Sequence, residues 1–149
     1  MERMDYAAAA PAGVKALGAV YGYVQQCGLP AQLVELVYLR ISLLNGCAYC
    51  IDKHSRDLLQ RGLAPAALAM VPAWREAGTL LDAREKAALA WAETVTLVGQ
   101  TQVPEADYAA AASVFSDKEL ADLTIAIGLM NAFNRLAISF RKTPDSARG

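Results

Sequence analysis

The chain has 149 residues, of which 55% are hydrophobic and 19% are charged, and its formal net charge is −1. This length suits a single domain with one core. The near-neutral charge gives no bulk attraction to nucleic acid or to an anionic membrane, so we expect neither partner. So large an apolar fraction in a small chain indicates that part of its surface is buried between identical subunits.

Helical signals follow one another along the chain, and no alternating strand pattern of useful length interrupts them. Prolines in first turns, two capping boxes and closing glycines mark the boundaries. We predict a single all-α domain over residues 1–149, with about seven helices and a frayed polar tail at about 142–149. The predicted helices are Pro11–Gln26, Pro30–Leu44, Cys47–Arg61, Pro65 to a break at Pro72, Asp82 to before Gly99, Pro104–Val114 and Ser116–Phe140.

The cysteines and the N-terminus indicate in which cellular compartment the protein works. No apolar run reaches the length of a membrane span, and the opening MERMDYAAAAPAG lacks the basic start and apolar core of a signal peptide. We therefore expect a cytoplasmic protein. In a reducing cytosol a CxxC pair indicates redox or metal chemistry rather than a disulfide framework. Cys27, which lies apart from the pair, is expected to be a small buried hydrophobe.

The second and third predicted helices form an antiparallel hairpin over about residues 30–61, because the turn at Gly46 favours a tight reversal. Cys47, Cys50 and His54 occupy relative positions 0, 3 and 7 after that turn, which places them on one stripe of a helix. The stripe starts at a helix N-terminus, where unpaired N–H groups and the helix dipole favour a thiolate. The sequence therefore predicts a reactive cysteine here.

Glu35 is an acidic residue on the first helix of the hairpin, among neighbours that leave almost no polar face. It lies about 15 Å before the turn and His54 about 12 Å beyond it, so the two side chains should be nearly level. A buried carboxylate needs a partner or takes up a proton. His54 and the cysteines are the nearby candidates, and an ion pair with Arg40, at i+5, is the less favourable structural alternative.

Together, Glu35, Cys47, Cys50 and His54, spaced E-x11-C-x2-C-x3-H, resemble the core motif of the alkylhydroperoxidase D family within the carboxymuconolactone decarboxylase-like superfamily. The local sequence SLLNGCAYCIDKHS is also typical of that family. The resemblance implies the AhpD-like helical bundle, assembled as a trimer or hexamer, and an alkylhydroperoxidase of peroxiredoxin type. Such an enzyme would reduce a hydroperoxide without a bound cofactor or metal, and a dithiol, a thioredoxin-like protein or a lipoyl-type reductant would regenerate it.

The residues alone leave open which cysteine attacks the peroxide. The helix dipole favours Cys47, whereas the i+4 neighbour His54 favours Cys50. The resemblance assigns attack to Cys50, resolution to Cys47, and proton relay to Glu35 and His54. Tyr49 stands where some family members have a second relay histidine, and a phenol with a reference pKa of about 10 is a poor base at neutral pH.

Three other functions remain open from the sequence. A zinc site would use both cysteines and His54, with Glu35 or another subunit as the source of a fourth ligand. A carboxymuconolactone decarboxylase-like enzyme would use acid–base chemistry and would need no cysteine pair. A non-enzymatic redox sensor or stress-response protein would change its assembly when the disulfide forms.

Further polar residues have structural interpretations. Ser42 is expected to bond a backbone carbonyl rather than line the site, and Asp57 to pair with Arg61 at the pocket rim. Asn131 and Asn134 need partners within an otherwise apolar helix. We expect those partners at the end of a neighbouring helix or across a subunit interface.

Overall fold

The computed structural model describes residues 1–149, which form helices and connecting turns without any strand. The all-α prediction is confirmed, and each of the seven predicted helices is present. They are α2 (Pro11–Gln26), α3 (Ala31–Asn45), α4 (Ala48–Gln60), α5 (Pro65–Met70), α6 (Ala83–Thr96), α8 (Glu105–Ala112) and α9 (Asp117–Ser139). The short helices that the sequence did not predict are α1 (Tyr6–Ala9), α7 (Val98–Thr101) and the 3-10 helices η1 (Val71–Glu76), η2 (Gly78–Leu80) and η3 (Asp145–Ala147).

The predicted boundary signals act as expected. At the start of α6 the Glu85 N–H donates to Asp82 Oδ1 at 2.7 Å, and the Asp82 N–H donates to Glu85 Oε2 at 3.0 Å. Ser116 and Glu119 form the same reciprocal capping box at the start of α9. The break predicted at Pro72 is also present, since α5 ends at Met70 and a 3-10 turn follows.

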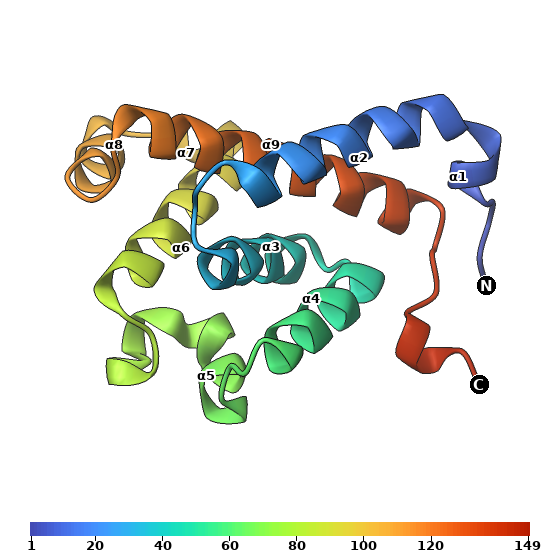
Figure 1. The fold of residues 1–149 in the computed structure, drawn as a ribbon, viewed down its shortest axis with the longest axis horizontal. Coiled ribbons are helices and arrows are strands. Elements are labelled where there is room, and N and C mark those ends of the chain that lie inside the picture. Colours follow the sequence, from blue (N-terminus) through green and yellow to red (C-terminus); the bar gives the residue numbers. More distant parts are fainter.

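Helix α3 is the centre of the fold and packs against α4, α6 and α9. Figure 1 shows α2 and α9 crossing above it, with α6 on one side and α4 on the other. Its fully buried side chains include Leu36, Val37 and Ile41, and each contributes roughly 1.5–3 kcal/mol through burial. The helix is therefore buried nearly all round, as its sequence predicts, and its apolar side chains belong to the main core cluster of 27 buried residues.

The two ends of the chain meet near α4 (Figure 1). The Arg3 N–H donates to the carbonyl of Phe140 at 2.9 Å, and the Tyr6 and Phe140 rings lie 5.8 Å apart. Within the predicted tail, the Ser146 hydroxyl donates to Asp52 Oδ1 on α4 at 2.5 Å. Hydrogen bonds from Ser146 also lower the pKa of Asp52, which favours the charged acceptor.

The exposed surface keeps several large apolar side chains, among them Tyr108, Val114 and Ile125 on the α8–α9 side of the chain. No helix here is both long enough and apolar enough to cross a membrane.

Candidate active site

The α3–α4 hairpin builds the site, and its turn has the predicted geometry. Gly46 follows α3 with a φ of 70°, in the left-handed region that glycine adopts without strain. Cys47 is the N-cap of α4, and its sulfur accepts a hydrogen bond from the Cys50 N–H at 3.3 Å. The helix therefore starts within one residue of the predicted position.

Cys47 and Cys50 are joined by a disulfide in the structure, with their Cα atoms 5.3 Å apart. Both are buried, with 1% and 4% of their surfaces exposed. The prediction that one helical turn brings the two sulfurs within bonding reach is confirmed. Cys27 remains a free thiol at a half-buried position, and its sulfur donates to the Val24 carbonyl at 3.0 Å. It lies somewhat more exposed than the sequence indicated.

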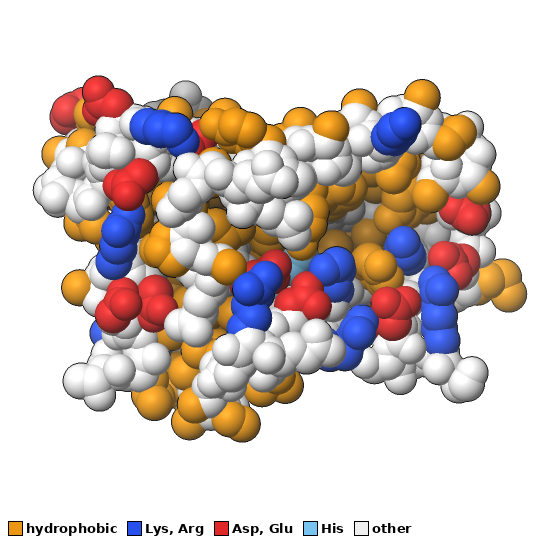
Figure 2. Space-filling view, in the orientation of Figure 1, with side chains coloured by type: hydrophobic (Ala, Val, Ile, Leu, Met, Phe, Trp, Pro, Cys, Tyr) orange, Lys and Arg blue, Asp and Glu red, His pale blue; other side chains and the backbone are white.

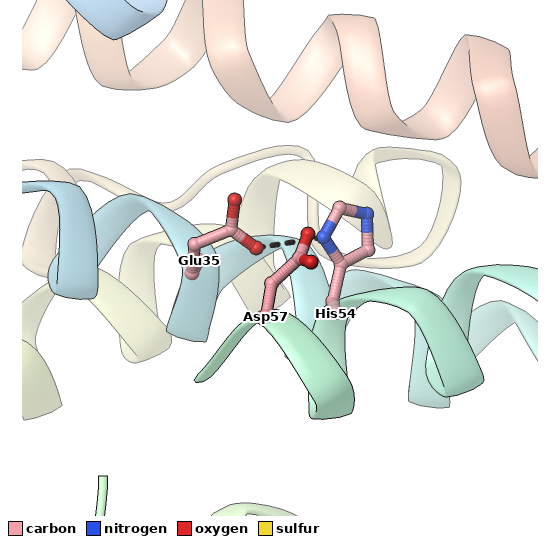
Figure 3. A group of neighbouring side chains, drawn as sticks. All are labelled: Glu35, His54 and Asp57. Atoms are coloured by element: carbon pink, nitrogen blue, oxygen red, sulfur yellow. Dashed lines mark hydrogen bonds and ion pairs between the residues drawn. The ribbon is translucent and has the colours of Figure 1, made fainter. Parts of the chain in front are cut away.

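Glu35 and His54 meet across the hairpin, as their distances from the turn predicted. The His54 Nδ1 and Glu35 Oε2 atoms are 2.8 Å apart, and the two residues are only 2% and 5% exposed. Figure 3 shows the contact, with the second imidazole nitrogen pointing away from the carboxylate. When Nδ1 carries the proton and donates it to Glu35, Nε2 is left free to accept a proton from another group.

Arg40, the alternative partner of Glu35, pairs instead with Glu93, where Arg40 Nε and Glu93 Oε1 are 2.8 Å apart. The separation of five positions along α3 points the side chains of Glu35 and Arg40 to different neighbours. Glu35 is thus free of the structural ion pair that the sequence left open.

The predicted pair of Asp57 with Arg61 is wrong. Asp57 Oδ2 instead lies 2.7 Å from Lys53 Nζ, one turn earlier on α4. This orientation brings the Asp57 carboxylate to the Glu35–His54 pair, and one donor atom from each of the three residues lies within 4.8 Å of the others (Figure 3). The zinc alternative needs the cysteines in one ligand set with His54, whereas the side chains gathered here are two carboxylates and the imidazole.

A cavity of about 250 Å³ opens beside the motif, and its walls are mostly apolar. Cys50 and His54 line it, whereas Cys47 and Glu35 do not. Figure 2 shows a hollow with apolar side chains in its depth, between α2 and α4, and basic side chains along its rim. The other walls come from α1, α2, α9 and the segment that follows α9, through side chains that include Tyr6, Tyr21, Met130, Phe133 and Lys142.

Tyr49 also lines this cavity, and its ring packs against a cation. The ammonium of Lys142 lies 4.2 Å from the centroid of the Tyr49 ring. The sequence identified Tyr49 as a departure from the family pattern but gave no sign of Lys142, which lies 93 positions further along in the polar tail. No local pattern could have linked the two residues.

Polar side chains from α9 hold the C-terminal end of α3. Asn45 Nδ2 donates to Asn131 Oδ1 and to Asn134 Oδ1, both at 3.0 Å. Asn134 Nδ2 donates to the Ser42 hydroxyl at 3.1 Å, and that hydroxyl donates to the Tyr38 carbonyl at 2.7 Å, as predicted for Ser42. The two asparagines therefore find their partners at the end of a neighbouring helix within the same chain, and they fix the turn that precedes Cys47.

The fold and the site together define the class of protein. The sequence model of the carboxymuconolactone decarboxylase family matches residues 7–94, which include the whole motif hairpin. The uncharacterized protein YdfG of Bacillus subtilis is 31% identical over 138 residues, which cover 93% of each chain. The chain belongs to the carboxymuconolactone decarboxylase family.

Comparison with two solved structures narrows the assignment within this family. A protein of unknown function from Agrobacterium tumefaciens, whose name proposes an antioxidant defence role as AhpD, is 35% identical and superposes with a TM-score of 0.92 over 97% of this chain and 98% of that one. An uncharacterized peroxidase-related protein from Silicibacter sp. TM1040 is 26% identical, with a TM-score of 0.79 over 89% and 70% of the two chains. The fold is therefore the AhpD-like one that the motif predicted.

Proposed function

We propose that this protein is a thiol-dependent peroxidase that reduces hydroperoxides by cycling between the Cys47/Cys50 dithiol and its disulfide. The observation that carries the proposal is that Cys50 and His54 line the apolar cavity, whereas their partners Cys47 and Glu35 lie outside its lining. A substrate in the cavity would therefore reach Cys50 and not Cys47. The antioxidant and peroxidase-related names of the two similar structures support the same chemistry.

The first step starts from the dithiol form. His54 Nε2 takes the proton of the Cys50 thiol, and the thiolate attacks the terminal oxygen of R–O–OH. An S–O bond forms and the O–O bond breaks, so Cys50 becomes a sulfenic acid. The departing alkoxide takes the proton back from the imidazolium and leaves as an alcohol. Glu35 fixes the imidazole tautomer through Nδ1 and stabilises the imidazolium while it exists.

The second step closes the disulfide. The Cys47 thiol attacks the sulfur of the Cys50 sulfenic acid, the S–S bond forms and water leaves. The two residues are one helical turn apart, so little movement is required. An external dithiol, from a small molecule, a thioredoxin-like protein or a lipoyl-type group, then reduces the disulfide by exchange and is itself oxidised.

We further propose that the cycle runs in the cytoplasm, where thiol-reducing systems supply its electrons. The assembly that we propose is a homo-oligomer, either a trimer or a hexamer. Exposed apolar side chains such as Tyr108, Val114 and Ile125 support this, because they lose contact with water at a subunit interface.

Peroxide consumption with dithiothreitol as donor tests the proposal. Wild type should turn over an organic hydroperoxide, Cys50→Ser should lose that turnover, and Cys27→Ser should keep it, because Cys27 does not line the cavity. Intact mass should fall by about two units when the reduced protein meets peroxide, through loss of two hydrogens. Full activity in Cys50→Ser would overturn the assignment of the attacking thiol.

An acid–base enzyme is the second candidate, because the Glu35–His54 pair can move a proton without any thiol. Such an enzyme would keep its activity toward a lactone acid in the Cys47→Ser/Cys50→Ser double variant, whereas the peroxidase would lose all turnover. A redox sensor would show clean disulfide formation and a changed oligomer mass without peroxide turnover.

A further inference from the structure

The cavity that reaches Cys50 carries two lysines, and their electrostatic situations differ. Lys53 Nζ lies 2.7 Å from Asp57 Oδ2, so its charge is already paired. Lys142 forms no ion pair, and its ammonium lies 4.2 Å from the Tyr49 ring centroid and 5.4 Å from that of Tyr6. Aromatic faces hold a cation in place but do not neutralise it. One uncompensated positive charge therefore stands at the wall of an otherwise apolar cavity.

The position of Lys142 is set by the meeting of the chain ends. The Lys142 N–H donates to the Ala137 carbonyl at 3.0 Å, just after α9 ends. Tyr6, which packs against the Lys142 ammonium, is held on the Phe140 ring at a centroid distance of 5.8 Å. Lys142 is thus half-buried, and its ammonium lies against two aromatic rings beside the cavity.

We propose that the cavity binds an amphiphilic hydroperoxide that carries a carboxylate, and that Lys142 recognises the carboxylate. This inference rests on the proposed peroxidase function. The apolar walls favour an alkyl or acyl chain. The hydroperoxide group is neutral and reacts at Cys50, so it needs no cation, and hydrogen peroxide would leave both the walls and Lys142 without a partner. A fatty-acid hydroperoxide would use the apolar walls, Lys142 and Cys50 together. Its chain would lie along the walls, its carboxylate would pair with Lys142, and its hydroperoxide group would react at Cys50.

Three hydroperoxides test the inference: linoleic acid hydroperoxide, its methyl ester, and cumene hydroperoxide, each with excess uncharged dithiothreitol as donor. Wild type should prefer the acid over the ester by about tenfold in kcat/KM, which corresponds to one charge-assisted contact. In Lys142→Gln that preference should fall to near one, through a higher KM for the acid. Lys15→Gln, which removes the same charge from an exposed site on α2, should keep the wild-type preference.

A carboxylate in the reductant would satisfy the same lysine, so a second arm compares dihydrolipoate with dihydrolipoamide as donors. A preference for dihydrolipoate that Lys142→Gln removes, without any preference for the acid peroxide, would overturn the substrate assignment. An equal rate for acid and ester in wild type would do the same while leaving the peroxidase proposal standing.

A binding measurement separates this inference from the proposed function. Decanoate should bind the oxidised protein about tenfold more tightly than decanol in calorimetric titration, and Lys142→Gln should lose that difference. If decanoate binds more tightly than decanol but no hydroperoxide is turned over, the peroxidase proposal is wrong. The same result would still support a carboxylate-bearing amphiphile as the ligand of the cavity. Equal binding of decanoate and decanol would overturn the ligand class, whatever the turnover.

Discussion

Two carboxylates on neighbouring helices, the buried Glu35 on α3 and the half-buried Glu93 on α6, have opposite surroundings. Glu93 accepts from Arg40 Nε at 2.8 Å, from Trp74 Nε1 at 2.6 Å and from Arg75 Nη1 at 2.9 Å. Glu35 has one hydrogen bond, with His54 Nδ1 at 2.8 Å, and a second carboxylate close by. A carboxylate surrounded by donors has a structural role, whereas one that shares a single proton with an imidazole can take part in proton transfer.

The pKa of Glu93 reflects the three hydrogen-bond donors around its carboxylate. Burial opposes the charged form, but hydrogen bonds from Trp74, Arg75 and Arg40 outweigh it and hold the pKa below the ordinary glutamate value. The charge of Glu93 is therefore locked in the folded state at neutral pH. The difference between the two sites predicts that the same substitution, glutamate to glutamine, will damage activity at Glu35 and stability at Glu93.

Glu35→Gln is expected to have the largest effect. An amide cannot stabilise an imidazolium, so kcat/KM for an organic hydroperoxide should fall by about 100-fold, within the range for loss of proton-transfer catalysis. The folded state should persist, because the glutamine oxygen can still accept from His54 Nδ1. Steady-state kinetics, with circular dichroism as the folding control, measure both quantities. Activity within twofold of wild type would remove Glu35 from the proton relay.

Glu93→Gln should leave peroxide turnover near the wild-type level and lower the free energy of unfolding by about 2–3 kcal/mol, because Arg40 keeps a largely buried charge without a counterion. Urea unfolding at neutral pH measures this loss. Glu76→Gln is the matched control, since that glutamate is exposed and forms no ion pair, and it should change stability by less than about 0.5 kcal/mol.

The pH dependence of the free energy of unfolding provides a second test of the role of Glu93. The folded pKa of Glu93 is depressed below the ordinary value of 4.5, so its stabilising contribution is fully present above that pH and is lost as pH falls through the folded pKa. The stability difference between wild type and Glu93→Gln should therefore shrink as pH falls below 4.5. A difference that stays constant down to pH values well below that range would show that the loss at neutral pH comes from packing rather than charge.

The sequence predicted the parts of the site that depend on local geometry. The turn at Gly46 and the rise per residue of two helices were enough to bring Glu35 level with His54, and helical spacing was enough to pair Cys47 with Cys50. These contacts involve residues at most 19 positions apart, on elements with clear start and stop signals.

The cavity wall could not be predicted in this way. Tyr6 lies on a four-residue helix without any amphipathic pattern, and Lys142 lies in a polar tail that its composition marks as frayed. Only the tertiary contacts between the chain ends bring them to α4. The partner of Asp57 was missed for a simpler reason, because lysine and arginine one turn away on either side are equally good partners by spacing alone.

Tyr38→Phe is expected to have the smallest effect and to test what surrounds Glu35. The Tyr38 ring packs on His54 with centroids 5.2 Å apart, and its buried hydroxyl has no hydrogen-bond partner. Burial also raises the pKa of Tyr38, so the phenol stays neutral. Removing this hydroxyl breaks no bond and keeps the ring contact, so the free energy of unfolding should stay unchanged or rise by up to about 1 kcal/mol. Tyr38→Leu, which loses the ring, should destabilise the protein in the same urea experiment.

A loss above about 1 kcal/mol in Tyr38→Phe would show that an ordered water satisfies the hydroxyl. Glu35, whose charge contributes to the raised pKa of Tyr38, would then be a candidate acceptor for that water. The contrast between Glu35, with its single hydrogen bond, and Glu93, with three, would weaken.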